Sequence, residues 1–414
     1  MIMRAKASFR AIGAMLVILA SLLAAGQSMA EDKISAKVAK PMKAAQEAIQ
    51  KKQWDQALAK VSEADGVSEK TAFDQFQINE FKAYIFLQQR KYAEVARLYE
   101  ANLASGKQPP EQVNDRLKTL VQLHTATKNY PKVMEFGDRW IKAGGQDIDS
   151  RVLVAQAHYL QKDYKAAVEI MQGAIKSAEQ AGKPVDENWL QLVRSAQTNM
   201  GDKDGAAKTM EKLVQLYPKP EYWNFLIGTR LNEKTSDRVM LNTLRLAQQV
   251  GTLNSADQYL EMAELLLEAG LPGEAKSALE AGYTAKVVDP ADKAASDRYK
   301  RRFDDAKAAA TKDLQSLPQF EKDAQKGTTG QGDVALGMAY SSFGQYDKAA
   351  AALSRGLAKG GVRDPDQAQI MLGIADLKLG KKADAAKAFG QVNADPQMAD
   401  LARLWTIVAR SGAG

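Results

Sequence analysis

Two histidines have the clearest capacity for chemistry near neutral pH in this sequence. His124 and His158 lie 34 residues apart, and each precedes a tyrosine by six residues. Such a pair could bind a metal ion or transfer protons, because the imidazole pKa lies close to 7. The shared distance to a tyrosine, however, indicates equivalent positions in a repeat. We therefore interpret both as ring-sized core residues and expect at most a weak response to pH.

Other patterns that could carry chemistry are incomplete. Residues 327–332 are rich in glycine but lack the Gly-Lys-Ser/Thr ending that holds phosphate in a P-loop. The segment 202–205 resembles a fragment of a calcium loop without its further ligands. No His-Glu-x-x-His or Gly-x-Ser-x-Gly pattern occurs, while an acid–base pair among the many carboxylates stays open. We predict no catalytic residue, no cofactor and no metal, and hence no enzyme.

The N-terminal 30 residues have the order of parts found in a secretory signal peptide. Three basic residues, Arg4, Lys6 and Arg10, precede an apolar run over 11–26, and Ser28 and Ala30 supply the small residues before a cleavage point. The run is shorter than the roughly 20 residues that span a bilayer, although an uncleaved anchor is the alternative. We expect cleavage after residue 30, no stable membrane span thereafter, and a periplasmic location.

The amino-acid composition supports the periplasmic location and excludes several functions. The chain has no cysteine, which excludes disulfides, thiolate metal sites and cysteine nucleophiles and suits an oxidising compartment. Without the three basic residues of the signal segment, 54 basic side chains face 50 acidic ones. A surplus of four is too small to indicate nucleic-acid binding, so we expect no nucleic-acid partner.

The elements that must position any functional side chain repeat along the sequence. An aromatic residue followed three residues later by Ala or Val recurs every 34 to 38 residues, beginning at Trp54, Tyr92, Tyr130 and Tyr164, and returns at Tyr346. Around each one, apolar residues follow helical spacing on both sides of a short polar break. This period predicts stacked helical hairpins.

The best copy, over 333–357, carries a Leu-Gly pair at Leu336-Gly337, then Tyr340, a Gly-x-Tyr turn and Ala349. This pattern resembles the tetratricopeptide repeat. The resemblance implies an all-α, right-handed superhelical solenoid of about nine hairpins, with one long curved surface left free for a partner. Pro396 starts a final amphipathic segment that would cap the last apolar face, with Trp405 among the covering residues.

The repeats set the expected domain organisation. Residues 31–283 hold about seven repeats, one of them degenerate, and 331–394 hold two more, followed by the capping helix over 395–414. Between them, 284–330 is charged: its part from 290 to 326 has 16 charged residues in 37 and five large apolar ones. We expect a degenerate, less well packed helical segment there, either one long helix or a repeat, serving as a linker, hinge or docking arm.

In the family that the repeats resemble, the first helix of each hairpin lines a concave groove. The matching positions form a mostly polar, uncharged set: Glu80, Tyr84, Lys118, Gln122, Thr125, Gln156, Tyr159, Asn188 and Gln191. Amide side chains and tyrosines suit an extended peptide or a helix of another protein. Receptors of this family that bind a terminal carboxylate use a basic and asparagine clamp, whereas this chain has Met42 and Gln46 at those positions.

The sequence thus predicts a periplasmic scaffold that binds a protein or peptide of the cell envelope in its groove. The alternatives are a non-catalytic platform of a cell-envelope enzyme or energy-transduction complex, and a membrane-anchored assembly factor. The sequence leaves the partner and the oligomeric state open.

Overall fold

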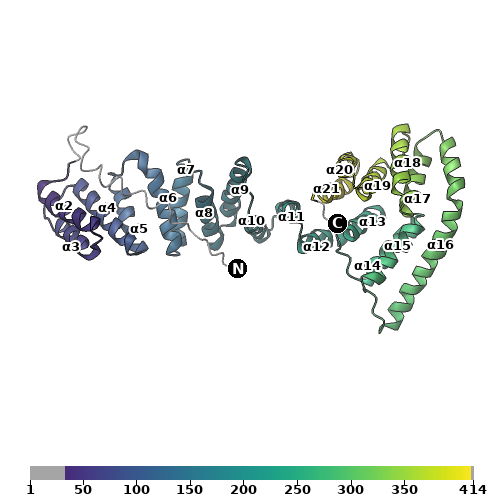
Figure 1. The fold of residues 1–414 in the computed structure, drawn as a ribbon, viewed down its shortest axis with the longest axis horizontal. Coiled ribbons are helices and arrows are strands. Elements are labelled where there is room, and N and C mark those ends of the chain that lie inside the picture. The colour runs from purple at the N-terminus through teal and green to yellow at the C-terminus, as the bar shows by residue number, and fades with distance from the viewer. Residues whose placement is uncertain (1–32, 412–414) are drawn as a thin grey trace. The chain divides into compact units, whose positions relative to one another are not determined.

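The computed structural model describes residues 33–411, which contain 20 α-helices and no β-strand (Figure 1). The predicted signal peptide, 1–30, lies outside the described residues. Nine pairs of consecutive helices and two single helices make up the described part, which confirms the predicted all-α hairpin solenoid. No described helix is both long enough and apolar enough to cross a membrane. The described residues form two compact units, divided between Ala206 and Ala207.

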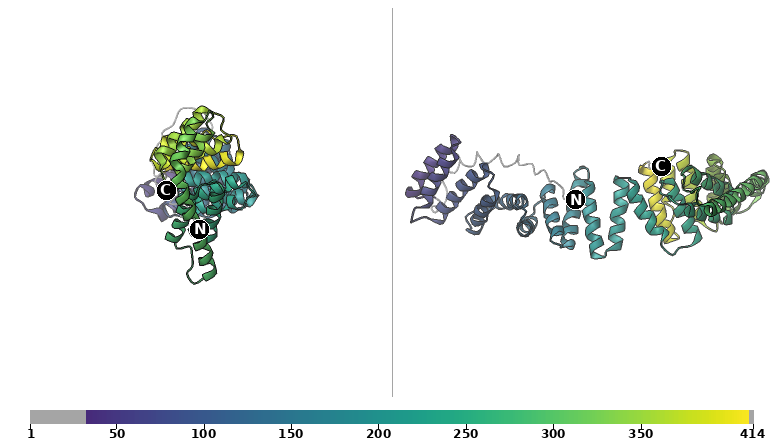
Figure 2. Two further views of the ribbon diagram at one scale, coloured as in Figure 1. Left: turned by 90° about the vertical axis from the view of Figure 1, so that its right-hand side faces the viewer. Right: turned by 90° about the horizontal axis from the view of Figure 1, so that it is seen from below.

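The first unit is a series of helical hairpins, each with a first helix, a short turn and a second helix. Its helices are α2 (Ala36–Gln50), α3 (Trp54–Asp65), α4 (Ala72–Gln88), α5 (Tyr92–Ala104), α6 (Pro110–Ala126), α7 (Tyr130–Lys142), α8 (Ile148–Leu160), α9 (Tyr164–Gln180) and α10 (Glu187–Met200), and α11 (Lys203–Leu216) crosses into the second unit. In the right-hand view of Figure 2, the helices of the first unit stand in a row in chain order.

Small residues let neighbouring helices approach where the repeat pattern places them. The residue three positions after each anchor aromatic, such as Ala57, Val133 or Ala167, is fully buried. Gly137 on α7 faces Val154 on α8 so closely that a Cβ would lie 2.4 Å from the valine methyl carbon. A larger side chain there would force the hairpins apart, because protein interiors have little free volume.

The second unit contains the remaining hairpins, one long helix and a terminal helix. They are α12 (Pro220–Leu231), α13 (Asp237–Gln249), α14 (Ala256–Glu268), α15 (Pro272–Thr284), α16 (Lys293–Lys326), α17 (Gln331–Ser342), α18 (Tyr346–Lys359), α19 (Pro365–Lys378), α20 (Lys382–Phe389) and α21 (Pro396–Ser411).

The charged segment forms one helix of 34 residues rather than a hairpin. α16 contacts α14 and α15 with its first part and α17 with its last part, and it runs along the edge of the unit in Figure 1. Its buried side includes Tyr299, whose hydroxyl donates to the carbonyl oxygen of Leu279 at 2.9 Å, and Leu317. The helix is therefore packed along its length, and its many charges occupy the other faces.

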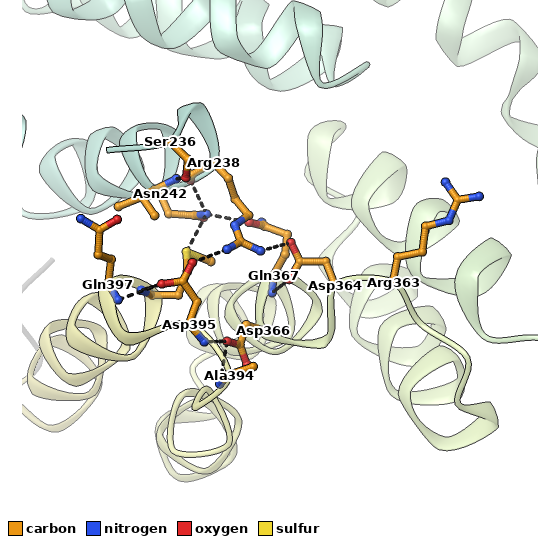
Figure 3. A network of polar contacts seen from close by, with 12 residues as sticks. Ser236, Arg238, Asn242, Arg363, Asp364, Asp366, Gln367, Ala394, Asp395 and Gln397 are labelled. Carbon is orange, nitrogen blue, oxygen red and sulfur yellow. Dashed lines mark hydrogen bonds and ion pairs between the residues drawn. The ribbon is translucent and has the colours of Figure 1, made fainter. Parts of the chain in front are cut away.

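The second unit closes on itself, which the sequence analysis did not foresee. α13 contacts α21, and Arg238 on α13 forms ion pairs with Asp364 and Asp395, the residues just before α19 and α21 (Figure 3). The amide of Asn242 donates to Gln367 at 2.6 Å. The expected long free surface is therefore wrong for this unit, because helices more than 120 residues apart in the sequence cover one another.

A buried carboxylate fixes the start of the terminal helix. Asp366 accepts hydrogen bonds from the backbone N–H groups of Asn393, Ala394 and Asp395, at 3.2, 3.0 and 2.8 Å (Figure 3). These bonds tie the loop before α21 to the first turn of α19. α21 then buries Leu401, Trp405 and Val408 against the preceding hairpin, which is the covering role that the sequence predicts for it.

Candidate functional site

The first helices of the first unit form its inner side. Neighbouring first helices contact each other in three of four cases (α2 with α4, α6 with α8, α8 with α10), whereas no two neighbouring second helices do so within the described part of this unit. First helices are therefore closer together than second helices, so the row curves with the first helices inside. This side of α6, α8 and α10 is the candidate site, and we call it the inner face.

Seven of the nine residues predicted for the groove lie on these three helices, and several connect them. Lys118 on α6 pairs with Asp147, the N-cap of α8, at 3.0 Å. The Tyr159 hydroxyl on α8 shares a hydrogen bond of 2.8 Å with Ser195 on α10. The inner face is thus held in a fixed curve by polar bridges between its own side chains.

The other members of this group keep polar atoms at the surface. Gln122, Gln156 and Gln191 are half-buried and Asn188 is exposed. Thr125 donates its hydroxyl to the carbonyl oxygen of Val121, one turn earlier on its own helix, at 2.7 Å. The face therefore offers amide and hydroxyl groups with little net charge.

The remaining two predicted residues lie on α4 and serve the packing. Glu80 accepts two hydrogen bonds of 2.9 Å from Arg116 and one of 2.7 Å from Asn102. Tyr84 is only 8% exposed and meets the ring of Trp54 edge-on. The structure does not bring these two together with the other seven as open surface, because neighbouring hairpins engage both.

Electrostatics keep Asp147 ionised at the inner face. Burial raises the pKa of its carboxyl, but hydrogen bonds from Ser150 and Lys118 together outweigh burial, and the net pKa lies below the ordinary value. The Lys118–Asp147 bridge is therefore formed across the neutral pH range, and a ligand at this face would meet no free cation from Lys118.

Two apolar residues at the edge of the inner face were missed by the sequence analysis. Leu160 ends α8 and is 49% exposed, and Met200 ends α10 and is 41% exposed. The two helices are first helices of adjacent hairpins, so their C-terminal ends lie on the same edge. The sequence signal was an apolar residue immediately before each polar turn, where solvent exposure favours polar residues.

The turn between the two helices has the same backbone geometry in most hairpins. In eight of the nine pairs, the residue two positions before the second helix has a left-handed backbone, with φ between +57° and +75°. The next residue then donates its N–H to the carbonyl oxygen five positions earlier, as Lys91 does to Phe86 and Gln345 to Tyr340. The shared geometry matches the Gly-x-Tyr turn noted in the sequence. The described residues thus have the repeated hairpins that the resemblance to the tetratricopeptide repeat implies.

Comparisons with known proteins found similarity to solved structures. No family model matches the chain, and no curated protein sequence matches it. Among solved structures, the chain is similar to YrrB, described as a tetratricopeptide protein with an unusual peptide-binding site, at 11% identity and a TM-score of 0.32, over 44% of this chain and 87% of that one.

Two further similar structures cover more of this chain. A tetratricopeptide protein of Parabacteroides merdae matches at 10% identity and a TM-score of 0.28, over 80% of this chain and 98% of that one. The yeast Sti1 TPR2AB domain, solved in a complex with pHSP90, matches at 12% identity and a TM-score of 0.23, over 72% of this chain and 99% of that one. No residue role is carried over from these proteins.

The two histidines occupy one slot of the tetratricopeptide hairpin, near the end of the first helix. His124 Nε2 lies 2.9 Å from Glu100 on the preceding second helix, and His158 lies 3.0 Å from Asp138 at the matching place. The His124 ring also stacks on Phe136. Both imidazoles are buried, and no cluster of metal-ligating side chains occurs in residues 33–411. The rings fill the core between hairpins, as interpreted from the sequence.

Burial makes the His124 position sensitive to acid. Burial is the largest influence on the pKa of His124 and lowers it; Glu100 opposes burial, and the net pKa lies below the ordinary value. The unfolded chain therefore takes up the proton first as pH falls, so the free energy of unfolding decreases below about pH 6.5.

The change His124→Phe should remove this part of the acid sensitivity. The ring volume and the contact with Phe136 are kept, while the titrating group is lost. Between pH 7.5 and 5.5, we expect the free energy of unfolding measured in urea to fall further for the natural chain than for the variant, by at most about 1.4 kcal/mol at pH 5.5. Equal falls in both proteins would contradict the assignment.

Proposed function

We propose that the chain is a non-catalytic scaffold that binds a segment of another protein on the inner face of its first unit. The observation that carries this proposal is the surface of α6, α8 and α10. It combines half-buried amides and a tyrosine with exposed Leu160 and Met200 along one edge. Surfaces of this kind suit a peptide backbone and one or two apolar anchors.

The charges of this face narrow the kind of segment. Lys118 is its one basic residue among the predicted positions and is already paired with Asp147. In the first hairpin, Met42 is buried and supplies no donor. We therefore propose an internal segment of the partner, extended or helical, rather than a free C-terminal carboxylate.

We further propose that the scaffold works in the periplasm. The proposal rests on the order of basic, apolar and small residues over 1–30 and on the absence of cysteine from the sequence. Mass spectrometry of the protein isolated from a bacterial envelope fraction tests it. A chain that begins at Glu31 is expected, and a chain that keeps residues 1–30 would instead support an anchored protein.

Site-specific photo-crosslinking in cells tests the binding face. A benzoylphenylalanine residue in place of Gln156 should crosslink a partner protein, because this position faces the inner side of α8. The same residue in place of Glu169, which is exposed on the second helix α9 of the same hairpin, is the matched control and should give no such product.

A second change tests whether Tyr159 contributes to the binding face. Tyr159→Ala should reduce the crosslink from position 156 several-fold, because the ring and its hydroxyl lie between α8 and α10, and Tyr159→Phe should retain most of it. Equal crosslinks from positions 156 and 169, or a crosslink unaffected by Tyr159→Ala, would place the partner elsewhere.

A further inference from the structure

The last hairpin departs from the others in the slot that holds His124 and His158. This slot lies six residues before the second helix. It holds an aromatic or imidazole ring in four of the other hairpins and a small, amide or aliphatic side chain in the remaining four (Phe86, His124, His158 and Tyr340; Ala48, Gln197, Leu231 and Leu266). Asp376 places an acidic residue in the slot, which none of the other eight hairpins of residues 33–411 does.

The partner of the slot is also changed. Glu100 and Asp138, which face the two histidines, lie eight residues after the first residue of the preceding second helix. The matching residue on α18 is Ser354. Where the hairpins of His124 and His158 place an imidazole beside a carboxylate, the last hairpin has a carboxylate and a hydroxyl at the matching positions.

The structure has a hollow of about 650 Å³ at this place, between α18, α19 and α20. Its lining includes small and apolar residues and five charged ones: Ala350, Ala351, Leu357, Leu372 and Ala388, with Asp347, Asp376, Asp384, Lys381 and Lys387. The lining also includes Ser354, Gln369 and Gln391, so the hollow is a mostly polar surface with small apolar parts and three carboxylates.

The carboxylate of Asp376 faces this hollow without a hydrogen-bond or ion-pair partner among the described residues. Its side chain lines the hollow and is 93% buried, since the residue is 7% exposed. Across residues 33–411, no hydrogen bond or ion pair reaches its carboxylate, although carboxylates elsewhere in the fold, such as Asp366, accept several hydrogen bonds. Burial raises the pKa of Asp376; Lys381 opposes burial from the rim and Asp384 adds to it. The carboxylate oxygens are not among the fully buried side-chain atoms without a partner, so they can be reached from the hollow. A cation there would pair with a largely buried acid.

An arginine or lysine side chain has a shape and charge that fit this hollow. The aliphatic stem of arginine or lysine would lie against Ala350, Ala351 and Leu372, and its charged head would reach Asp376. Three carboxylates against two lysines leave the lining negative. The volume exceeds that of one side chain, so residues beside the cation would also be received.

We propose that this hollow binds an arginine or lysine side chain of a partner protein, with Asp376 as its counter-ion. It lies in the second unit, on residues other than the inner face, and it gives the scaffold a second point of contact with its own chemistry.

Methyl NMR of the full chain, with ¹³C-labelled alanine methyl groups, tests the proposal directly. Ala350, Ala351 and Ala388 report from inside the hollow. N-acetyl-arginine N-methylamide and the lysine analogue are the probes, and the norleucine analogue, which has a similar stem and no charge, is the control. We expect saturable shifts of these three methyl groups with one or both cations and none with norleucine; the stronger of the two cations identifies the natural side chain.

Variants decide whether Asp376 is the counter-ion. Asp376→Asn should weaken probe binding at least tenfold, whereas Asp297→Asn, which removes an exposed acid from α16, should leave binding unchanged. Lys381→Gln should strengthen binding, because Lys381 competes for the same carboxylate. The absence of saturable shifts in the natural chain, or equal binding by Asp376→Asn, would overturn the proposal.

A refilled slot provides a test that does not rely on the loss of charge. The double variant Asp376→His with Ser354→Glu copies the His124–Glu100 arrangement into the last hairpin. It should fold, occupy the part of the hollow beside position 376 and weaken the alanine shifts caused by the probes. Probe binding with unchanged affinity in this folded variant would show that the hollow is not the site.

Discussion

The change Trp405→Ala should unfold the C-terminal end of the second unit while the first unit stays intact. Trp405 is 1% exposed and stacks on Phe389 of α20, with ring centroids 5.6 Å apart. Removing a buried indole costs about 3–5 kcal/mol, because apolar contacts are lost and a cavity remains. α21 also contacts α13 and α19, so its release exposes both helices.

Hydrogen exchange measured by mass spectrometry locates this effect. Peptides from α19, α20 and α21 should lose protection in Trp405→Ala, and peptides from α4 to α8 should keep it. Unchanged protection of α19 and α20 would show that α21 is not needed to cover them.

The conservative change Trp405→Phe is the matched control. The indole nitrogen is buried and has no hydrogen-bond partner among the described residues. Phenylalanine removes this unpaired donor, whose burial destabilises the fold by about 1–3 kcal/mol. It also keeps a ring against Phe389. We therefore expect a loss below about 2 kcal/mol, well under that of alanine.

The change Arg116→Ala should destabilise the first unit by about 3–5 kcal/mol, the usual cost of removing one partner from a buried ion pair. The Arg116 side chain is 6% exposed, donates twice to Glu80 at 2.9 Å, and stacks on the ring of Tyr99 at 3.6 Å. Its loss leaves the Glu80 carboxylate in the core with only the amide of Asn102 as donor. Urea unfolding followed by circular dichroism measures the change.

A double variant tests whether the destabilisation comes from leaving one charge of the ion pair without its partner. Glu80→Gln with Arg116→Met removes both charges, and we expect this double variant to be more stable than Arg116→Ala, because no buried charge is left alone. Arg116→Lys should still be destabilising, since an ammonium group has one nitrogen, whereas the guanidinium donates to Glu80 and Gln108 from two different nitrogens. If Arg116→Ala cost less than about 1 kcal/mol, the pair would contribute no more than a surface ion pair.

The placement of the groove residues shows where prediction from the repeat stops. The register placed Gln156 and Tyr159 on a first helix, because helical periodicity is local, and Tyr159 reaches Ser195 on the next first helix. It could not show that Glu80 is engaged by Arg116, 36 residues later, or that Trp54 covers Tyr84. Burial depends on the neighbouring hairpin, and the period of one repeat contains no information about which neighbour supplies the covering group.

The sequence by itself determined the hairpins, their order and their turns. Second helices begin at the anchor residues of the pattern, Trp54, Tyr92, Tyr130, Tyr164 and Tyr346. Each repeat buries one apolar stripe against the next, and the residues of that stripe are close together in the sequence.

Only the tertiary structure decided that the second unit closes and that α16 is packed along its length. Arg238 meets Asp364 and Asp395 across 126 and 157 residues of sequence, and Asn242 and Gln367 are buried although they are polar. A hydrophobic pattern predicts that a polar residue is exposed to solvent. Its burial becomes favourable only when a distant partner completes its hydrogen bonds. That pairing is a property of the folded chain and leaves no periodic trace in the sequence.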